Sequence, residues 1–257
     1  MSAWKDSMAT HINLPAPGLD ISHPKLRHIL CAQSLKVLSM RLRFCLHPEL
    51  NPIRLFAPSK TIFVRVPKNA SSSIVSMLYP VPGANKLPHF SAEFYRRVFP
   101  SQFRDWLVFA PLRNPLDRLA SAFTYYREKT TIPQERQLMD EDLPFLRTFS
   151  DFVHWLNDQE DISAPRIMQW HHFRRQSDFV SDARGALITN LLFPVEDMSD
   201  GIARLQKHAN ITGAVPRLNV TRPLDLSGLP LARVTAHYAG DIALWERCMD
   251  EKSIETA

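Results

Sequence analysis

The spacing of apolar and polar positions predicts two strand–turn–helix units in the middle of the chain. In the first unit, the β-branched and apolar run 61–66 predicts a buried strand that Pro67 ends, and residues 74–78 have the spacing of a helix that faces a sheet. In the second unit, the apolar run 106–110 predicts a strand and residues 114–123 predict a helix. Strands that alternate with helices favour an α/β fold with a mostly parallel sheet covered on both faces.

The helix of the second unit has clear start signals. Asn114 can cap it and Pro115 suits its first turn. Its apolar residues gather on one face, which predicts that this face packs on the sheet. A polar stripe is expected on the opposite face, formed by Arg118, Ser121 and Tyr125.

The remaining segments are mainly helical. A short apolar run at 186–193 predicts a third strand, and helical patterns follow from the spacing at 146–156, 198–209 and 234–249. Residues 1–58 are polar and interrupted by proline, with one amphipathic helix expected around 26–44. We therefore expect an N-terminal appendage or cap at 1–58 and a single domain at 59–257.

Composition excludes several classes of protein. Hydrophobic residues make up 45% and charged residues 22% of the 257 residues, which is an ordinary globular balance and excludes disorder and collagen-like repeats. The formal net charge of +5 suits an anionic ligand but is too dilute to indicate nucleic acid. No glycine lies between Gly18 and Gly83, so a glycine-rich phosphate loop cannot occur there.

Cysteine usage and the N-terminal sequence bear on the compartment. The 3 cysteines are odd in number and widely spaced, which predicts neither a disulfide framework nor a zinc site. The first residues lack the apolar core of a secretory signal, and the charged residues within 29–46 argue against a membrane span. We expect a cytoplasmic protein without a transmembrane segment, either free or attached to a membrane surface.

The first turn is a candidate anion cradle. A helix that begins near Ser71 has unpaired backbone N–H groups at its start, and its dipole favours negative charge there. The neighbouring small residues let a phosphate approach the backbone, and Lys68 adds a full positive charge. A serine-rich helix cap beside a surface lysine explains the same residues without a ligand.

The second turn is a candidate site for another phosphate. Arg113 follows the strand at the edge of a parallel sheet where ligands bind, and Ser121 lies about two turns into the next helix. A guanidinium group matches phosphate with paired hydrogen bonds. A salt bridge of Arg113 and a solvated serine are the alternative. Two anion sites at adjacent strand ends make that alternative less attractive.

These two turns resemble motifs of the family-2, carbohydrate-type sulfotransferases. Residues 66–74 (VPKNASSSI) resemble the 5′-phosphosulfate loop of the family, and residues 113–123 (RNPLDRLASAF) resemble its 3′-phosphate motif. Residues 172–176 (HFRRQ) are similar to a downstream H-[FW]-x-P-Q element, although Arg175 replaces the proline. Weaker similarities occur at 218–221 (LNVT) and in the pair Tyr238 and Asp241.

The resemblance implies a P-loop-like α/β fold and the donor 3′-phosphoadenosine 5′-phosphosulfate (PAPS), with 3′,5′-ADP (PAP) as the product. By position, Arg113 and Ser121 would hold the 3′-phosphate. The 5′-phosphosulfate would be held by Pro67, Lys68, Asn69, Ala70, Ser71, Ser72 and Ser73. Sulfuryl transfer requires less charge neutralisation than phosphoryl transfer, so Lys68 at the bridging oxygen can take the place of a metal, and no metal is expected.

Transfer to a hydroxyl also needs a general base. The position of His89 before the Arg113 motif is similar to that of the catalytic histidine of uronyl 2-O-sulfotransferases. Glu93 is the other candidate, and a loop histidine bonded to backbone is the alternative for His89. His172 is expected to order the site or to contact a substrate. The adjacent His171 suggests a metal site, but neighbouring histidines have poor ligand spacing.

The acceptor and two competing functions complete the expectations. A hydroxyl of a saccharide or glycoconjugate is the expected acceptor, and Trp155, Trp170 and Phe173 are candidates for a sugar groove or for the core. A P-loop kinase would need ATP and Mg²⁺, and the absence of G-x-x-x-x-G-K-[ST] argues against it. A non-catalytic polyanion-binding module would bind with a steep salt dependence, but its basic residues should be more concentrated than these are.

Overall fold

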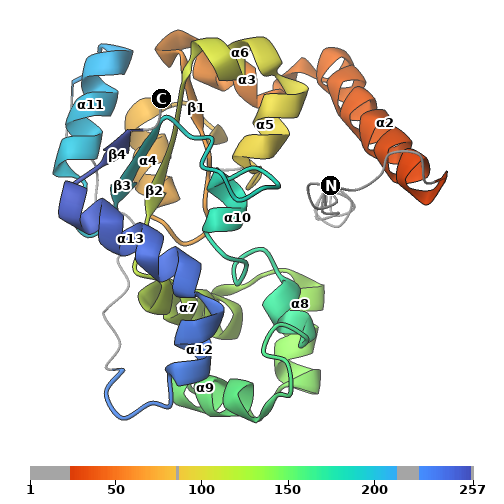
Figure 1. Ribbon diagram of the computed structural model, residues 1–257, viewed down its shortest axis with the longest axis vertical. Coiled ribbons are helices and arrows are strands. Elements are labelled where there is room, and N and C mark those ends of the chain that lie inside the picture. Colours follow the sequence, from red (N-terminus) through yellow and green to blue (C-terminus); the bar gives the residue numbers. More distant parts are fainter. Residues whose placement is uncertain (1–23, 85–86, 213–225, 256–257) are drawn as a thin grey trace.

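The computed structural model describes residues 24–84, 87–212 and 226–255, with side chains from residue 35 onward. In this part of the chain, four strands form one sheet in the order β1-β2-β3-β4 (Figure 1). β1, β2 and β3 are parallel, and β4 pairs antiparallel with β3. The strands are β1 (Thr61–Phe63), β2 (Leu107–Leu112), β3 (Leu191–Pro194) and β4 (Ile254–Glu255). The predicted α/β class with a mostly parallel sheet is confirmed.

The first strand is shorter than the predicted run 61–66. β1 ends at Phe63, although the backbone N–H of Val64 still donates to the carbonyl of Phe109 at 2.9 Å. The side chains of 64–66 are buried all the same. The apolar pattern therefore reports burial of the loop that follows β1, and this loop leads directly to the first candidate turn.

The third strand begins later than the predicted run 186–193. It starts at Leu191, because the residues before it pair elsewhere. Leu187 forms an isolated bridge with Ser181, and the backbone N–H of Ile188 donates to the carbonyl of Val180 at 3.0 Å. The first half of the predicted strand is thus a return loop against the end of a short helix.

Helices flank the sheet and build a second layer beyond it. α11 and α13 contact β3, and α3 contacts β1. In the lower part of Figure 1, α7, α8, α9 and α12 form a helical region away from the sheet. The helices are α2 (Pro24–Leu46), α3 (Pro52–Phe56), α4 (Ser71–Leu78), α5 (Ala92–Val98), α6 (Pro100–Asp105), α7 (Pro115–Thr124), α8 (Pro133–Gln137), α9 (Phe149–Asp158), α10 (Ser177–Val180), α11 (Ser199–Ala209), α12 (Ala232–His237) and α13 (Ala239–Glu251).

Short turns complete the element list, and the predicted C-terminal helix is divided. Three single 3₁₀ turns and two π-helical turns occur in the described residues: η1 (Pro48–Leu50), η2 (Ala57–Ser59), η6 (Arg166–Gln169), η4 (Tyr125–Lys129) and η5 (Leu138–Asp142). The helix predicted at 234–249 is two helices, α12 and α13, separated at Tyr238. The largely helical second half of the chain agrees with the prediction.

The polar stripe predicted on α7 is buried rather than open. As expected, Asn114 caps this helix and accepts hydrogen bonds from two backbone N–H groups of its first turn. However, Arg118 is 1% exposed and Ser121 is 3% exposed. Arg118 is covered because it donates to the backbone carbonyls of Pro67 and Arg174. The apolar residues of α7 belong, with those of α9, to a second hydrophobic core and not to the core around the sheet, so the predicted packing of this face on the sheet is wrong.

The N-terminal segment is partly integrated into the core. Leu35, Leu38, Leu42 and Leu46 of α2 are exposed. Val37, Met40 and Phe44 of the same helix pack against the hydrophobic core around the sheet, so the amphipathic helix predicted there does bury one apolar face. Phe56 of α3 belongs to the same core. Within the described ranges, no helix is both long enough and apolar enough to cross a membrane.

Candidate active site

The loop between β1 and α4 has the backbone geometry of an anion-binding turn. Lys68 and Ala70 have positive φ angles of 68° and 52°, a left-handed conformation that non-glycine residues adopt only at a cost. Turns that place successive residues in such conformations direct backbone N–H groups into a concavity. Ala70 is the N-cap of α4 and forms no side-chain cap hydrogen bond. The start of α4 therefore has the features expected of an anion site.

Asn69 fixes this loop to the neighbouring strand. Its side chain is fully buried, and its Nδ2 donates to the carbonyl of Pro111 at 2.8 Å and to Oε1 of Gln176 at 2.6 Å. Because β1 ends at Phe63, the carbonyl of Pro111 in β2 takes its donor from this side chain. Asn69 therefore supports the loop from behind.

Gln176 joins the two candidate turns. Its Oε1 also accepts from the backbone N–H of Arg113 at 3.0 Å, and its Nε2 donates to the carbonyl of Arg113 at 2.8 Å. The backbone N–H groups of Gln176 and Ser177 in turn donate to the carboxylate of Asp241 at 2.5 and 2.9 Å. The sequence signalled these residues only as weak motifs, and their role as supports depends on tertiary structure.

The two predicted cationic residues lie close together. Nη1 of Arg113 donates to the carbonyl of Lys68 at 3.4 Å, and both side chains are half-buried. Burial, with the neighbouring charges of Lys129 and Arg113, lowers the pKa of Lys68 to about 8. Burial also lowers the pKa of Arg113. Positive charge is thus held in a partly desolvated position, which an anion would stabilise.

Arg118 stabilises the same turn from inside the protein, and sequence reasoning did not find this role. Its Nε donates to the carbonyl of Pro67 at 3.0 Å and its Nη2 donates to the carbonyl of Arg174 at 2.7 Å. Ser121 is one turn further along α7 and is also buried. Arg118, which belongs to the second motif, therefore holds the backbone of the first motif.

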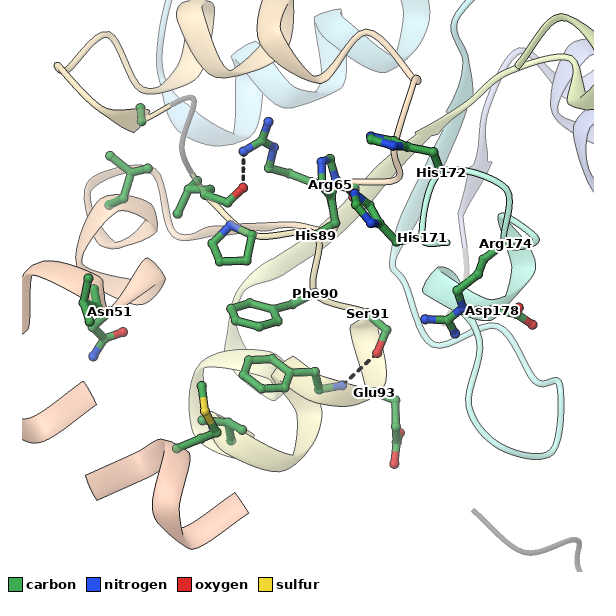
Figure 2. A pocket seen from close by; sticks show the side chains of 18 of the residues that line it. Asn51, Arg65, His89, Phe90, Ser91, Glu93, His171, His172, Arg174 and Asp178 are labelled. Carbon is green, nitrogen blue, oxygen red and sulfur yellow. Dashed lines mark hydrogen bonds and ion pairs between the residues drawn. The ribbon is translucent and has the colours of Figure 1, made fainter. Parts of the chain in front are cut away.

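Three histidines meet in the cleft next to these turns (Figure 2). The ring of His89 lies 5.3 Å from that of His171 and 6.0 Å from that of His172. Nδ1 of His89 is 2.7 Å from the carbonyl oxygen of Arg65. A carbonyl can only accept, so this nitrogen carries the proton and Nε2 keeps its lone pair. Burial and the charge of Arg65 hold the pKa of His89 well below its usual value.

Glu93 lies apart from these histidines. Its carboxylate forms ion pairs of 2.6 Å with both Arg96 and Arg97 on the same helix, α5. In Figure 2 it points away from His89. Two arginines occupy the oxygens of this carboxylate, so the geometry favours His89 over Glu93 as a base.

Tyr125 connects the lysine turn with the histidines, and this link was not predicted. Nζ of Lys68 lies 4.8 Å from the centre of the Tyr125 ring, which is 4.9 Å from the ring of His172. The next residue, Tyr126, places its hydroxyl 2.5 Å from Nδ1 of His172. Both tyrosines begin the π-helical turn η4, a kind of helix distortion that is frequent at functional sites.

The three histidines line an open cleft of about 3460 Å³ that extends to α2 and α5. Trp170 lines it and, like Trp155, packs against the second hydrophobic core, in which Phe173 is buried. The further lining residues include Arg65, Phe90, Phe94, Tyr125 and Arg166. Basic, aromatic and hydrogen-bonding groups are therefore mixed along its walls. The predicted motif at 218–221 lies outside the described residues.

Comparison with known proteins agrees with this geometry. A family model described as the sulfotransferase family matches residues 53–225, which include both turns, His89 and the Gln176 segment. No curated protein and no solved structure matched the chain at a significant level. The family match covers more than half of the chain and the α/β architecture is consistent with it. The chain therefore belongs to the sulfotransferase family.

Proposed function

We propose that the protein transfers a sulfuryl group from PAPS to a hydroxyl group of a saccharide or glycoconjugate. The observation that carries this proposal is the 3.4 Å contact between Arg113 and the backbone of Lys68. It joins two turns that follow neighbouring parallel strands, β1 and β2. Ligands of open α/β sheets bind at the carboxyl ends of the strands.

Each end of the donor has its own group of residues in this proposal. The start of α4, Lys68 and the small residues that follow it bind the 5′-phosphosulfate through backbone N–H groups and one full charge. Arg113 and Ser121 bind the 3′-phosphate, which distinguishes PAPS from ATP. The side chains of Asn69 and Gln176 hold the two turns together.

The transfer step uses His89 as general base. The acceptor oxygen forms a bond to sulfur while the bond between sulfur and the bridging oxygen of the 5′-phosphate breaks. Nε2 of His89 takes the hydroxyl proton, and Lys68 stabilises the charge that develops on the bridging oxygen. This scheme needs no metal ion, because one lysine supplies the positive charge.

The cleft suits a sugar acceptor. It is large and lies beside His89, and it combines the aromatic face of Trp170 with charged and polar residues. Specific sugar binding draws on both kinds of group, since polar contacts orient the ligand and apolar surface excludes water. We place the reaction in the cytoplasm, because the free thiols of Cys45 and Cys248 suit a reducing compartment.

The direct test is sulfation by the purified protein. The protein is incubated with PAPS and a panel of glycans, and mass spectrometry detects products that carry an added sulfate. Lys68→Ala and Arg113→Ala should lose donor binding and turnover, and His89→Ala should lose turnover but keep PAP binding. Arg104→Ala, an exposed arginine paired with Asp105, is the control. Wild-type rates in His89→Ala would refute the base, and transfer from ATP with Mg²⁺ instead would favour a kinase.

A further inference from the structure

Three imidazoles meet in the cleft, and the proposed transfer reaction needs only one of them. His89 follows β1 and α4, whereas His171 and His172 come from the segment after η6, more than 80 positions along the chain. The fold nevertheless brings one ring nitrogen of each within 4.8 Å of the other two. The proposed reaction uses only His89 as a proton acceptor, so the convergence of the other two rings calls for a separate explanation.

The hydrogen bonds behind two of these rings leave the same kind of nitrogen available. Nδ1 of His89 is bonded to the carbonyl of Arg65, and Nδ1 of His172 is bonded to the hydroxyl of Tyr126. Each ring is thus oriented by a partner on the far side from its Nε2. Histidines that bind metals have this arrangement, with one nitrogen held by a carbonyl or another polar group while the other binds the ion.

We propose that His89, His171 and His172 bind a single divalent transition-metal ion such as Zn²⁺, and that the bound ion inhibits sulfuryl transfer. In a tetrahedral zinc site with Zn–N distances of about 2.1 Å, the ligand nitrogens are about 3.4 Å apart. Because the present separations are within 4.8 Å, side-chain rotations that shorten them by up to about 1.4 Å reach this geometry. The fourth position is open to water from the cleft.

Inhibition follows from the chemistry of one lone pair. When Nε2 of His89 donates its pair to the metal, it cannot also accept the proton of the acceptor hydroxyl. This part of the proposal rests on the proposed function, whereas metal binding itself does not. The positive charges of Arg65 and Arg118 act on His89 and oppose a cation. We therefore expect a reversible site, weaker than structural zinc sites that have thiolate ligands.

Metal binding is tested first, without donor or acceptor. Chelator-treated protein is titrated with ZnCl₂ by calorimetry, and with CoCl₂, whose tetrahedral complexes absorb strongly in the visible range. We expect one ion per chain and at least about tenfold weaker binding in His171→Ala, since even the loss of an outer partner costs that much. His154→Ala is the matched control, because His154 is exposed on α9 and bonds only within its own helix.

Two results would overturn the metal site: no binding to the wild type, or equal affinity in His171→Ala. If His171→Ala does not fold by circular dichroism, His171→Gln replaces it. Inhibition is then measured as the ratio of turnover with ZnCl₂ to turnover with EDTA, each variant being compared with itself. The concentration for half inhibition should rise about tenfold in His171→Ala and stay unchanged in His154→Ala. Binding without inhibition would refute the lone-pair argument, and calorimetry still decides metal binding if no acceptor is sulfated.

Discussion

At the scale of single residues, Lys68 shows how the fold prepares a site for an anion. It is half-buried in a left-handed backbone conformation, beside Arg113 and over the ring of Tyr125. These surroundings lower the pKa of its amine to about 8, because desolvation and nearby positive charge disfavour the ammonium form. In the free protein the charged form of Lys68 is therefore destabilised, and a negatively charged ligand would stabilise it.

This lowered pKa predicts the pH dependence of PAP binding. The ligand binds the charged lysine, so above pH 8 binding must add a proton to Lys68, and the dissociation constant should rise about tenfold per pH unit. Calorimetry in buffers of different ionisation enthalpy measures this proton uptake. Lys68→Arg is the control, since its guanidinium stays charged and should remove the dependence. A wild-type affinity that is constant from about pH 7 to about pH 9.5 would contradict the assignment.

At the scale of elements, the packing of α11 against β3 requires a glycine at position 201. A Cβ placed on Gly201 would lie 2.1 Å from Cγ of Phe193, which is far too close. Phe193 is fully buried in β3 and cannot move away without disturbing the sheet. The glycine therefore allows the helix to approach the strand closely.

We predict that Gly201→Ala lowers the free energy of unfolding by about 1–3 kcal/mol, the usual cost of overpacking. Gly240→Ala is the matched control, because a Cβ on Gly240 of α13 meets nothing within 4 Å. That variant should not be less stable than the wild type, since alanine favours helices. Chemical denaturation measures the free energy of unfolding of both variants. Equal stability of the two would contradict the close contact at Gly201.

The hydrogen bonds of Gln176 predict a second effect at the scale of elements, on the binding of the donor rather than on the packing of the sheet. Gln176→Ala removes one of the two acceptors of the Asn69 amide and the partner of both the N–H and the carbonyl of Arg113, and a buried group left unpaired costs about 1–3 kcal/mol. The KM for PAPS should rise more than kcat falls, because the turns lose their relative position. The control is Gln137→Ala, whose exposed side chain donates to Glu141 outside the cleft. An unchanged KM in Gln176→Ala would remove its positioning role.

The sequence predicts the elements well and their limits less well. Apolar periodicity gives β2, α4, α7 and α11 nearly residue by residue, because each buries apolar side chains: β2, α4 and α11 in the core around the sheet, and α7 in the second hydrophobic core. It overextends β1 and β3, since residues 64–66 and 186–188 are apolar but lie in loops. The periodic pattern reports burial, and only strand pairing decides where a strand ends.

The candidate site is predictable only where it is local. Both turns and the cap at Asn114 can be identified from neighbouring residues, and Arg113 does lie beside Lys68. The convergence of His89 with His171, the π-helical turn at Tyr125 and the burial of Arg118 depend on contacts between distant segments. The neighbours of a residue along the chain do not determine such contacts, because the segments meet only in the folded protein.

At the scale of the whole molecule, the core extends into the segment that the sequence suggested as an appendage. Phe56 is fully buried in the cluster around the sheet, where its ring packs 5.2 Å from Tyr79 and 6.0 Å from Tyr95. The family match also begins before residue 58. We propose that the folded unit starts within α2 or α3 rather than at residue 59.

This boundary predicts a stability difference between two positions of the segment 1–58. Phe56→Ala should cost about 3–5 kcal/mol, as for other large buried aromatic residues. Leu38→Ala, at a position of α2 that is 62% exposed, should stay within about 0.5 kcal/mol of the wild type. Thermal or chemical unfolding measures both. A near-neutral Phe56→Ala would restore the view of 1–58 as a separate appendage.

The most direct measurement for the whole account compares the binding of 3′,5′-ADP and 5′-AMP to the wild type and to Arg113→Ala. We predict that 3′,5′-ADP stabilises the wild type by about 2.7 kcal/mol at a concentration near a hundred times its dissociation constant, and that 5′-AMP stabilises it far less at the same concentration. Arg113→Ala should lose this preference for the 3′-phosphate. Equal stabilisation by the two nucleotides, or a preference that survives in Arg113→Ala, would contradict the joint donor site at the ends of β1 and β2.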